Sequence, residues 1–199
     1  IHDWEYAFQG RSEEDVRAHI AQGRFGSWDE TERYTHLAVL VGTLFGMGYG
    51  ESIGRFILDD GFEIPTPEEL WESLNDDYRS RAADVLLPAR AELLTFMQRF
   101  DIASGPLRIE HRHPEFSIAA AACRADIPLT VHPGIGYDIV YAHPMANGAA
   151  LGRAAGIDFS VFVRSVGQLH RGGVFLSVGS AVMAPQVFEK AVSIANNLR

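Results

Sequence analysis

Ile-Pro-Leu-Thr-Val-His-Pro-Gly-Ile-Gly-Tyr-Asp-Ile-Val-Tyr-Ala-His, residues 127–143, is the stretch of sequence from which we predict the fold. It begins with an apolar, β-branched run at 129–131, which is typical of a short buried strand. Pro133, Gly134 and Gly136 follow at once and indicate a sharp turn. In an open α/β sheet, ligands bind outside the carboxyl ends of the strands, so this turn is the first candidate for a site.

Polar side chains crowd the same turn: His132, Tyr137, Asp138 and His143. Histidine suits acid–base chemistry because its ordinary pKa lies near neutrality. We predict catalytic roles for the two histidines and for Asp138. The alternative is structural: an ordinary strand and loop, with His132 hydrogen-bonded in the core and Asp138 capping the next helix.

A second buried strand is predicted at 174–178, Val-Phe-Leu-Ser-Val. The turn Gly179-Ser180 follows it, and an amphipathic helix runs from Pro185 to Leu198. Ser180 could bond a phosphate or ribose at this strand end, or it could simply cap the helix. Because an Ala-rich helix precedes the strand at 129–131, the order of elements matches half of a βαβ unit.

Residues 30–100 are expected to form a helical insertion or lid, with a kink near Pro88. Within it, the glycines at 46–50 match no phosphate-binding fingerprint, so we expect a flexible or closely packed connection there. Residues 62–67 are expected to be a linker, and 104–106 a turn. None of these segments carries a convincing chemical motif.

The chain has 199 residues, which suits a single domain spanning 1–199 with a substantial core. Its net charge of −9 argues against a nucleic-acid partner or an anionic membrane. We find neither a signal peptide nor a run near the ~18 apolar residues that span a bilayer, so we expect a cytoplasmic protein. Cys123 is the only cysteine, which excludes an intrachain disulfide. We predict no metal site, since His111 and His113 have no third ligand fixed by spacing.

The first residues are apolar at a helical spacing, and they begin at Ile1 without a methionine. His2 and Asp3 lie at the start of this expected helix, where unpaired backbone N–H groups favour an anion. The alternative for His2 is a disordered end residue. We expect a further segment upstream of Ile1.

Three blocks of the sequence resemble the deoxyhypusine synthase-like family, most closely its bacterial members. They are Ile-His-Asp at 1–3 with Ser-Glu-Glu-Asp at 12–15, Thr-Val-His-Pro-Gly-Ile-Gly-Tyr-Asp-x4-His at 130–143, and Gly-Gly-Val-Phe-Leu-Ser-Val-Gly-Ser at 172–180. The resemblance implies an α/β fold with a Rossmann-like parallel sheet and flanking helices, with the first βαβ unit upstream of this chain. It also implies NAD at the strand ends and a site shared within a homo-oligomer, a dimer or a tetramer.

One departure from the family bears on the reaction. By position, Asp138 and His143 look like the acid and the closing histidine of a family block, and Gly179-Ser180 like its late glycine turn. The family enzyme forms an imine on a lysine just after that turn, but Ala-Val-Met follows here, and the only lysine is Lys190. We therefore do not expect deoxyhypusine synthesis itself.

The resemblance implies an NAD-dependent enzyme that acts on a small polar or amine-bearing metabolite. The residues expected to approach the cofactor are His2, Asp3, Gly134, Gly136, Gly179 and Ser180. Two alternatives stay open: a non-redox transferase or hydrolase of a nucleotide-like substrate, and a non-catalytic assembly subunit.

Overall fold

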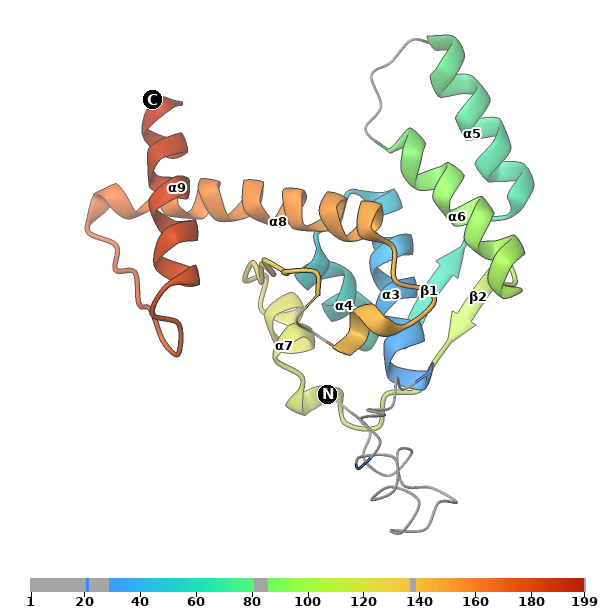
Figure 1. The fold of residues 1–199 in the computed structure, drawn as a ribbon, viewed down its shortest axis with the longest axis horizontal. Helices are drawn as coiled ribbons and strands as arrows, with labels where there is room; N and C mark the ends of the chain where they lie inside the picture. The colour runs from blue at the N-terminus through green and yellow to red at the C-terminus, as the bar shows by residue number, and fades with distance from the viewer. Residues whose placement is uncertain (1–20, 22–28, 81–85, 137–138, 199) are drawn as a thin grey trace.

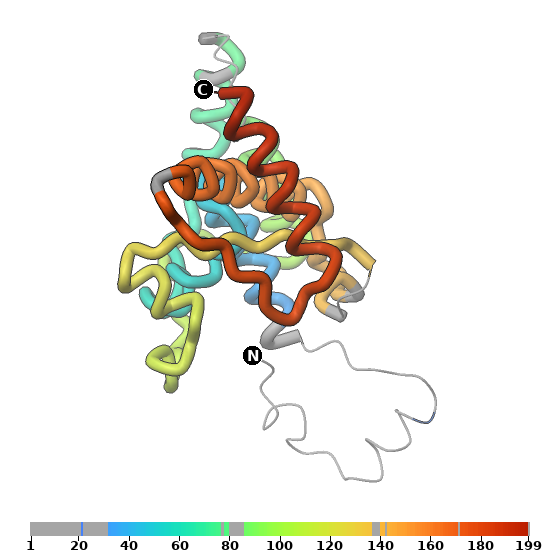
Figure 2. Tube along the Cα trace, turned by 90° about the vertical axis from the view of Figure 1, so that its left-hand side faces the viewer, coloured from blue at the N-terminus to red at the C-terminus, as the bar shows by residue number. Residues whose placement is uncertain are grey.

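Two helices, α3 (Asp29–Gly42) and α8 (Gly148–Gly167), lie at the centre of the computed structural model (Figure 1). The structure describes residues 21, 29–80, 86–136 and 139–198. Helix α4 (Tyr49–Leu58) packs against both central helices, and α7 (Ile118–Arg124) packs against α4. Helix α9 (Met183–Asn197) crosses the far end of α8 (Figures 1 and 2).

The other side of α3 is covered by a helical hairpin and a small sheet. The hairpin consists of α5 (Pro67–Ser80) and α6 (Leu87–Phe100), and the sheet of β1 (Gly61–Ile64) and β2 (Gly105–Arg108). Four short 3-10 turns complete the described elements: η1 (Thr43–Phe45), η2 (Pro114–Phe116), η3 (Ile139–Ala142) and η4 (Leu169–Arg171).

The two-stranded sheet occupies part of the segments for which the sequence predicted a linker and a turn, so these predictions are wrong over residues 62–64 and 105–106. Strands β1 and β2 are antiparallel, with Phe62 opposite Leu107 and Glu63 opposite Pro106. Phe62 and Leu107 pack on the main core, which gives the pair its apolar face. Proline is tolerated because each strand of a two-stranded sheet keeps one edge without a partner.

The predicted Rossmann-like parallel sheet is absent from the described residues, and the fold is helix-rich with mixed α and β elements. Residues 129–131 join no ladder, and the Val131 N–H donates instead to an Asp158 carboxylate oxygen at 2.8 Å. Residues 174–178 also lie outside any strand. Apolar, β-branched composition makes a segment competent to be a strand, but a strand exists only where a neighbour pairs with it.

Helix starts follow local capping chemistry. Thr66 and Glu69 form the reciprocal capping box of α5, with N–H···O distances of 3.1 and 2.8 Å. The Ser117 hydroxyl caps α7 by accepting from the Ala120 N–H. The predicted kink near Pro88 is wrong, because this proline lies in the first turn of a separate helix, α6, where its missing N–H costs nothing.

Helix α8 begins at Gly148, directly after Asn147. The Asn147 side-chain oxygen accepts from the N–H groups of Ala149 and Ala150, at 2.9 and 3.2 Å, and so caps the helix there. The small residues that follow are good enough helix formers to continue it, apart from the glycines. The result is a 20-residue helix that contributes Ala150 to one hydrophobic core and Val163 to another.

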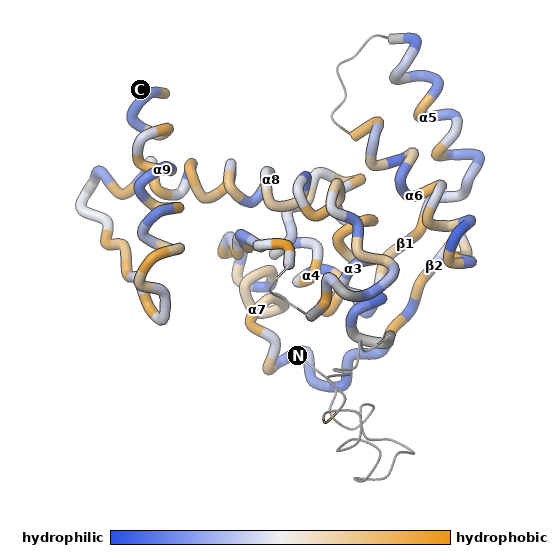
Figure 3. Tube along the Cα trace, viewed as in Figure 1, coloured by the Kyte–Doolittle hydropathy of each residue, from blue (hydrophilic) through white to orange (hydrophobic). Residues whose placement is uncertain are grey.

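The main core consists of apolar side chains from residues 37–102 that pack around the start of α8. Its buried members are Leu37, Leu40, Val41, Ile64, Leu70, Leu93, Met97, Ile102, Met145 and Ala150. A second core lies between the end of α8 and α9, around Val163, Val166, Ala191 and Ala195. Helix α9 alternates apolar and polar patches along its length (Figure 3), as expected for a helix with one packed face.

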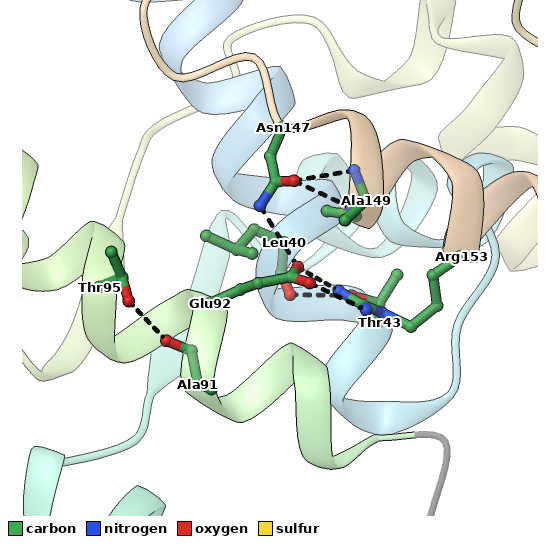
Figure 4. Close-up of polar contacts among 9 residues, drawn as sticks. Leu40, Thr43, Ala91, Glu92, Thr95, Asn147, Ala149 and Arg153 are labelled. Atoms are coloured by element: carbon green, nitrogen blue, oxygen red, sulfur yellow. Dashed lines mark hydrogen bonds and ion pairs between the residues drawn. The ribbon is translucent and has the colours of Figure 1, made fainter.

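A polar bridge joins α6 to the start of α8 (Figure 4). Glu92 forms an ion pair with Arg153 at 2.6 Å, and the two side chains are only 20% and 13% exposed. The Asn147 amide donates to the same carboxylate at 3.3 Å. One acidic side chain thus holds both the cap and the second turn of α8 against the hairpin.

The glycine cluster at 46–50 packs closely between helices. A side chain at Gly48 would meet the Asp158 carboxylate, and one at Gly50 would meet the Leu129 carbonyl oxygen. The chain bends by 107° between α3 and α4. No single described helix is long and apolar enough to cross a bilayer, although the stretch from Glu32 to Phe45 and α4 would reach that composition together.

We expect Gly50→Ala to destabilise the fold, by about 1–3 kcal/mol, because the new methyl group overlaps the Leu129 carbonyl. Gly152→Ala is the matched control. Gly152 lies inside α8 with nothing within 4 Å of an added Cβ, so alanine should stabilise by about 0.5–1 kcal/mol. Urea unfolding measures both changes. Equal stability of the Gly50 variant and the parent would contradict the close approach of α4 to residue 129.

Candidate functional site

Two histidines from distant parts of the sequence meet in the interior, and we call them the histidine pair: His36 on α3 and His143 after η3. Their rings stack with centroids 6.1 Å apart and planes at 23°. His36 is 4% exposed and His143 is 7% exposed. The Tyr141 ring lies 6.5 Å from His36 and covers it from a second direction.

Hydrogen bonds define one nitrogen of each ring. His36 Nε2 lies 2.6 Å from the Val140 carbonyl oxygen, which can only accept, so this nitrogen carries a proton. His143 Nδ1 lies 3.1 Å from the Met145 N–H, which can only donate, so this nitrogen carries none. A neutral His143 therefore holds its proton on Nε2. Fixing the tautomer in this way prepares a histidine for directed proton transfer.

Burial is the main cause that lowers the pKa of His36, since a charged imidazolium is disfavoured away from water. The hydrogen bond to Val140 opposes this shift, and the nearby His143 adds to it. Glu32 lies one turn before His36 on α3 and is fully buried. Three titratable side chains are thus taken out of water near one end of α3.

A second polar centre, which we call the Asp158 junction, joins α4, α8 and residues 129–131. One carboxylate oxygen of Asp158 accepts from the Gly50 N–H at 3.1 Å and from the Val131 N–H at 2.8 Å. The side chain is 2% exposed. Burial raises the pKa of Asp158, while the hydrogen bonds from Val131 and Gly50 oppose the rise. The start of α4 also favours a negative charge at this position.

His132 lies beside the Asp158 junction. Its ring faces the edges of Phe159 and Phe162, with centroids 6.2 and 5.4 Å away, and its Nε2 is 3.3 Å from the Thr130 hydroxyl. Burial lowers the pKa of His132, and the attraction of Asp158 opposes that shift. The aromatic surroundings make His132 part of the packing between α8 and the extended segment.

The structure does not bring His132 and His143 together. His143 lies near the start of α8, where Met145 packs with Ala150, whereas His132 lies near Asp158. Ala150 and Asp158 are eight residues apart, about 12 Å along a helix at ~1.5 Å per residue. Asp138 lies outside the described residues, so its relation to either histidine stays a prediction.

The residues expected to hold NAD include two glycine turns and Ser180 in the described part of the chain. Gly136 and Gly179 have positive φ angles of 111° and 73° and open space around them, as glycine turns for a ligand require. However, neither turn, nor Gly134 within the first, follows a strand of a shared sheet. The Ser180 hydroxyl accepts from the Ala184 N–H at 3.0 Å, which is the helix-capping alternative. His2 and Asp3 lie outside the described residues.

Two buried titratable residues of α3, Glu32 and His36, were not predicted as site residues from the sequence. They are four residues apart and therefore share one face of α3. That face also carries Leu40, which is 1% exposed. The sequence feature that could have identified them is a pair of titratable residues, at positions i and i+4, on the apolar face of a helix.

Other candidate groups lie at the surface. His111 pairs with Asp60 at 3.3 Å and His113 with Glu115 at 3.6 Å. Across the described ranges, no cluster of three or more His, Cys, Asp or Glu residues could hold a metal ion. Lys190, the only lysine, is exposed on α9 and pairs with Glu189.

Comparison of the chain with protein-family models, with curated proteins and with solved structures found no match. The resemblance to the deoxyhypusine synthase-like family therefore remains an expectation based on the sequence blocks. The histidine pair and the Asp158 junction are the buried polar centres of the described residues that could support a function. Of these two, only the pair contains a titratable group with a defined tautomer and a second titratable ring beside it.

Proposed function

We propose that this chain is an enzyme that uses acid–base catalysis on a small polar or amine-bearing metabolite, with His143 as the proton-transferring residue. The single observation behind the proposal is the defined tautomer of His143. Its Nδ1 accepts the Met145 N–H, so Nε2 is the nitrogen that carries the proton of the neutral ring. General acid–base catalysis by one histidine typically contributes ~10²–10⁴-fold to a rate.

His36 acts in this proposal as a positioning residue. Burial is the main cause that lowers the pKa of His36, so a positive charge on its ring is disfavoured. The stacked ring packs against His143 and restricts its orientation. The net charge of −9 supports a cationic substrate class, since an acidic protein attracts cations by long-range electrostatics.

The test begins with a thermal-shift titration of the purified protein against polyamines, NAD and NADH, because a ligand that binds only the native state raises its melting temperature. Turnover of any stabilising amine is then compared between the parent and His143→Asn. Asparagine can present an oxygen to the Met145 N–H but cannot titrate. We expect turnover to fall by ~10²–10⁴-fold with little change in melting temperature.

His170→Asn is the matched control, since His170 is an exposed histidine at the end of α8, bonded to the Gly167 carbonyl. It should retain full turnover. Full activity of His143→Asn, or the absence of a shift with every amine tested, would contradict the proposal. A saturable shift with NAD, followed by an absorbance change at the nicotinamide band during turnover, would support the NAD-dependent form of the enzyme.

The proposal also includes two expectations from the sequence: that the enzyme binds NAD and that it is located in the cytoplasm. The catalytic role proposed for His143 does not depend on NAD. A cell fractionation experiment tests the location directly. The assembly-subunit alternative has one observation in its favour, the apolar segment between α8 and α9.

A further inference from the structure

The segment that connects α8 to α9 exposes large apolar side chains. Val174, Leu176 and Val178 are 75%, 77% and 88% exposed. Val182 and Met183 continue this surface at 60% and 56%. Figure 3 shows the connection as a largely apolar trace beside α9. Single exposed apolar residues are ordinary, but a contiguous group marks an interaction site.

The segment has the β-branched and aromatic composition of a β-strand. Phe175 stacks on Phe188 of α9, with ring centroids 3.9 Å apart, and so anchors the segment to that helix. The Ser177 hydroxyl donates to the Ser180 carbonyl oxygen at 2.8 Å, a bond within the same connection. Residues 174, 176, 177 and 178 are all exposed.

No described residue pairs with this strand-like segment. The backbone groups of 174–178 make no hydrogen bond to any described part of the chain. A row of unpaired N–H and C=O groups next to an apolar stripe is a template for adding another strand. Charged side chains, which commonly protect such an edge, are missing from the whole stretch 172–188.

The exposed side chains favour a second copy of the chain as the partner. Val174, Leu176 and Val178 read the same in both directions about Leu176, so two antiparallel copies would place leucine opposite leucine and valine opposite valine. Two copies, each with a net charge of −9, repel one another over most of their surfaces. The uncharged stretch at 172–188 is a place where they can approach without like-charge contacts.

We propose that residues 174–178 pair as an antiparallel strand with the same residues of a second copy, about a two-fold axis at Leu176. Leu176 then lies opposite Leu176 of the second copy, and Val174 lies opposite Val178. Directly opposed residues of antiparallel strands have Cα atoms about 4.5–5.5 Å apart, within the range of a disulfide. The proposal is independent of the function assigned to the histidine pair.

Disulfide trapping tests the register. In a Cys123→Ser background, Leu176→Cys should form a covalent dimer under mild oxidation. Val174→Cys and Val178→Cys should each stay uncrosslinked alone and should crosslink when the two variants are mixed. A covalent dimer of Val174→Cys alone would overturn the antiparallel register in favour of a parallel one.

Oligomeric state tests the interface without new cysteines. Light scattering across a dilution series should show a dimer for the parent, and Leu176→Glu should raise the dimer Kd at least tenfold, because two carboxylates would then face each other. Ile118→Glu, at an equally exposed position, should leave the Kd unchanged. A monomeric parent at all concentrations, or a dimer unaffected by Leu176→Glu, would overturn the proposal. A monomer that instead pairs with a strand of a different protein is one form of that outcome.

Discussion

Replacement of Asp158 by alanine should cost about 2–4 kcal/mol of unfolding free energy. The same carboxylate oxygen accepts both the Gly50 and the Val131 N–H, and the side chain is 2% exposed. Alanine would leave both donors without a partner, at about 1–3 kcal/mol for each buried donor. The Gly50 donor is buried and should account for most of the loss, whereas water can reach Val131 more easily. Urea unfolding with a melting curve measures the change.

Asp158→Asn separates the hydrogen bonds from the charge. The amide oxygen can accept both N–H groups, so this variant should retain most of the stability that alanine loses. Burial raises the pKa of Asp158, so the native state holds its proton more tightly than the unfolded chain does. The stability of the parent relative to the Asn variant should therefore fall as the pH rises from about 4 through the raised pKa, and then level off. A cost of alanine below ~0.5 kcal/mol would show that the junction does not hold α4 to α8.

Local chemistry determines the parts of the fold that a sequence can predict. The start of α5 follows from two residues, Thr66 and Glu69, which bond one another three positions apart without help from the rest of the chain. The start of α8 has a similar local cause, since the Asn147 side-chain oxygen accepts from the first N–H groups of the helix. Capping residues therefore mark the starts of both helices, α5 and α8.

The strands could not be predicted in the same way, since a strand depends on a partner distant in sequence. Residues 129–131 and 174–178 have the composition of buried strands, yet the first is held by Asp158 and the second pairs with no described residue. Conversely, β1 and β2 have the appearance of a linker and a turn, but Phe62 and Leu107 place them on the core. Contacts with residues distant in sequence therefore determine whether each of these four segments forms a strand.

The candidate site likewise depends on residues that are distant in sequence. His143 was identified from its neighbours in sequence, whereas His36 reaches it from 107 positions earlier in the chain. No spacing rule connects the two residues. What the sequence did contain was a titratable pair, Glu32 and His36, within the buried face of a helix, and such residues are seldom buried without a partner or a role.

Glu92→Ala should cost about 3 kcal/mol, because it leaves the Arg153 guanidinium mostly buried without its carboxylate. Breaking a buried ion pair by removing one partner typically costs ~3–5 kcal/mol, and the partial exposure of this pair places it at the lower end. The loss extends to Asn147, whose amide donates to the same carboxylate while its oxygen caps α8 (Figure 4). Urea unfolding of the variant provides the measurement.

A double variant distinguishes the charge pair from simple packing. Glu92→Leu with Arg153→Met replaces both charges by apolar side chains, and such replacements are often neutral in stability. We expect the double variant to be more stable than Glu92→Ala by at least ~1 kcal/mol. If Glu92→Ala alone costs less than ~1 kcal/mol, the pair behaves as an exposed surface pair. In that case the hairpin of α5 and α6 is held to α8 by the apolar contacts of the main core, through Leu93 and Met145, and not by this polar bridge.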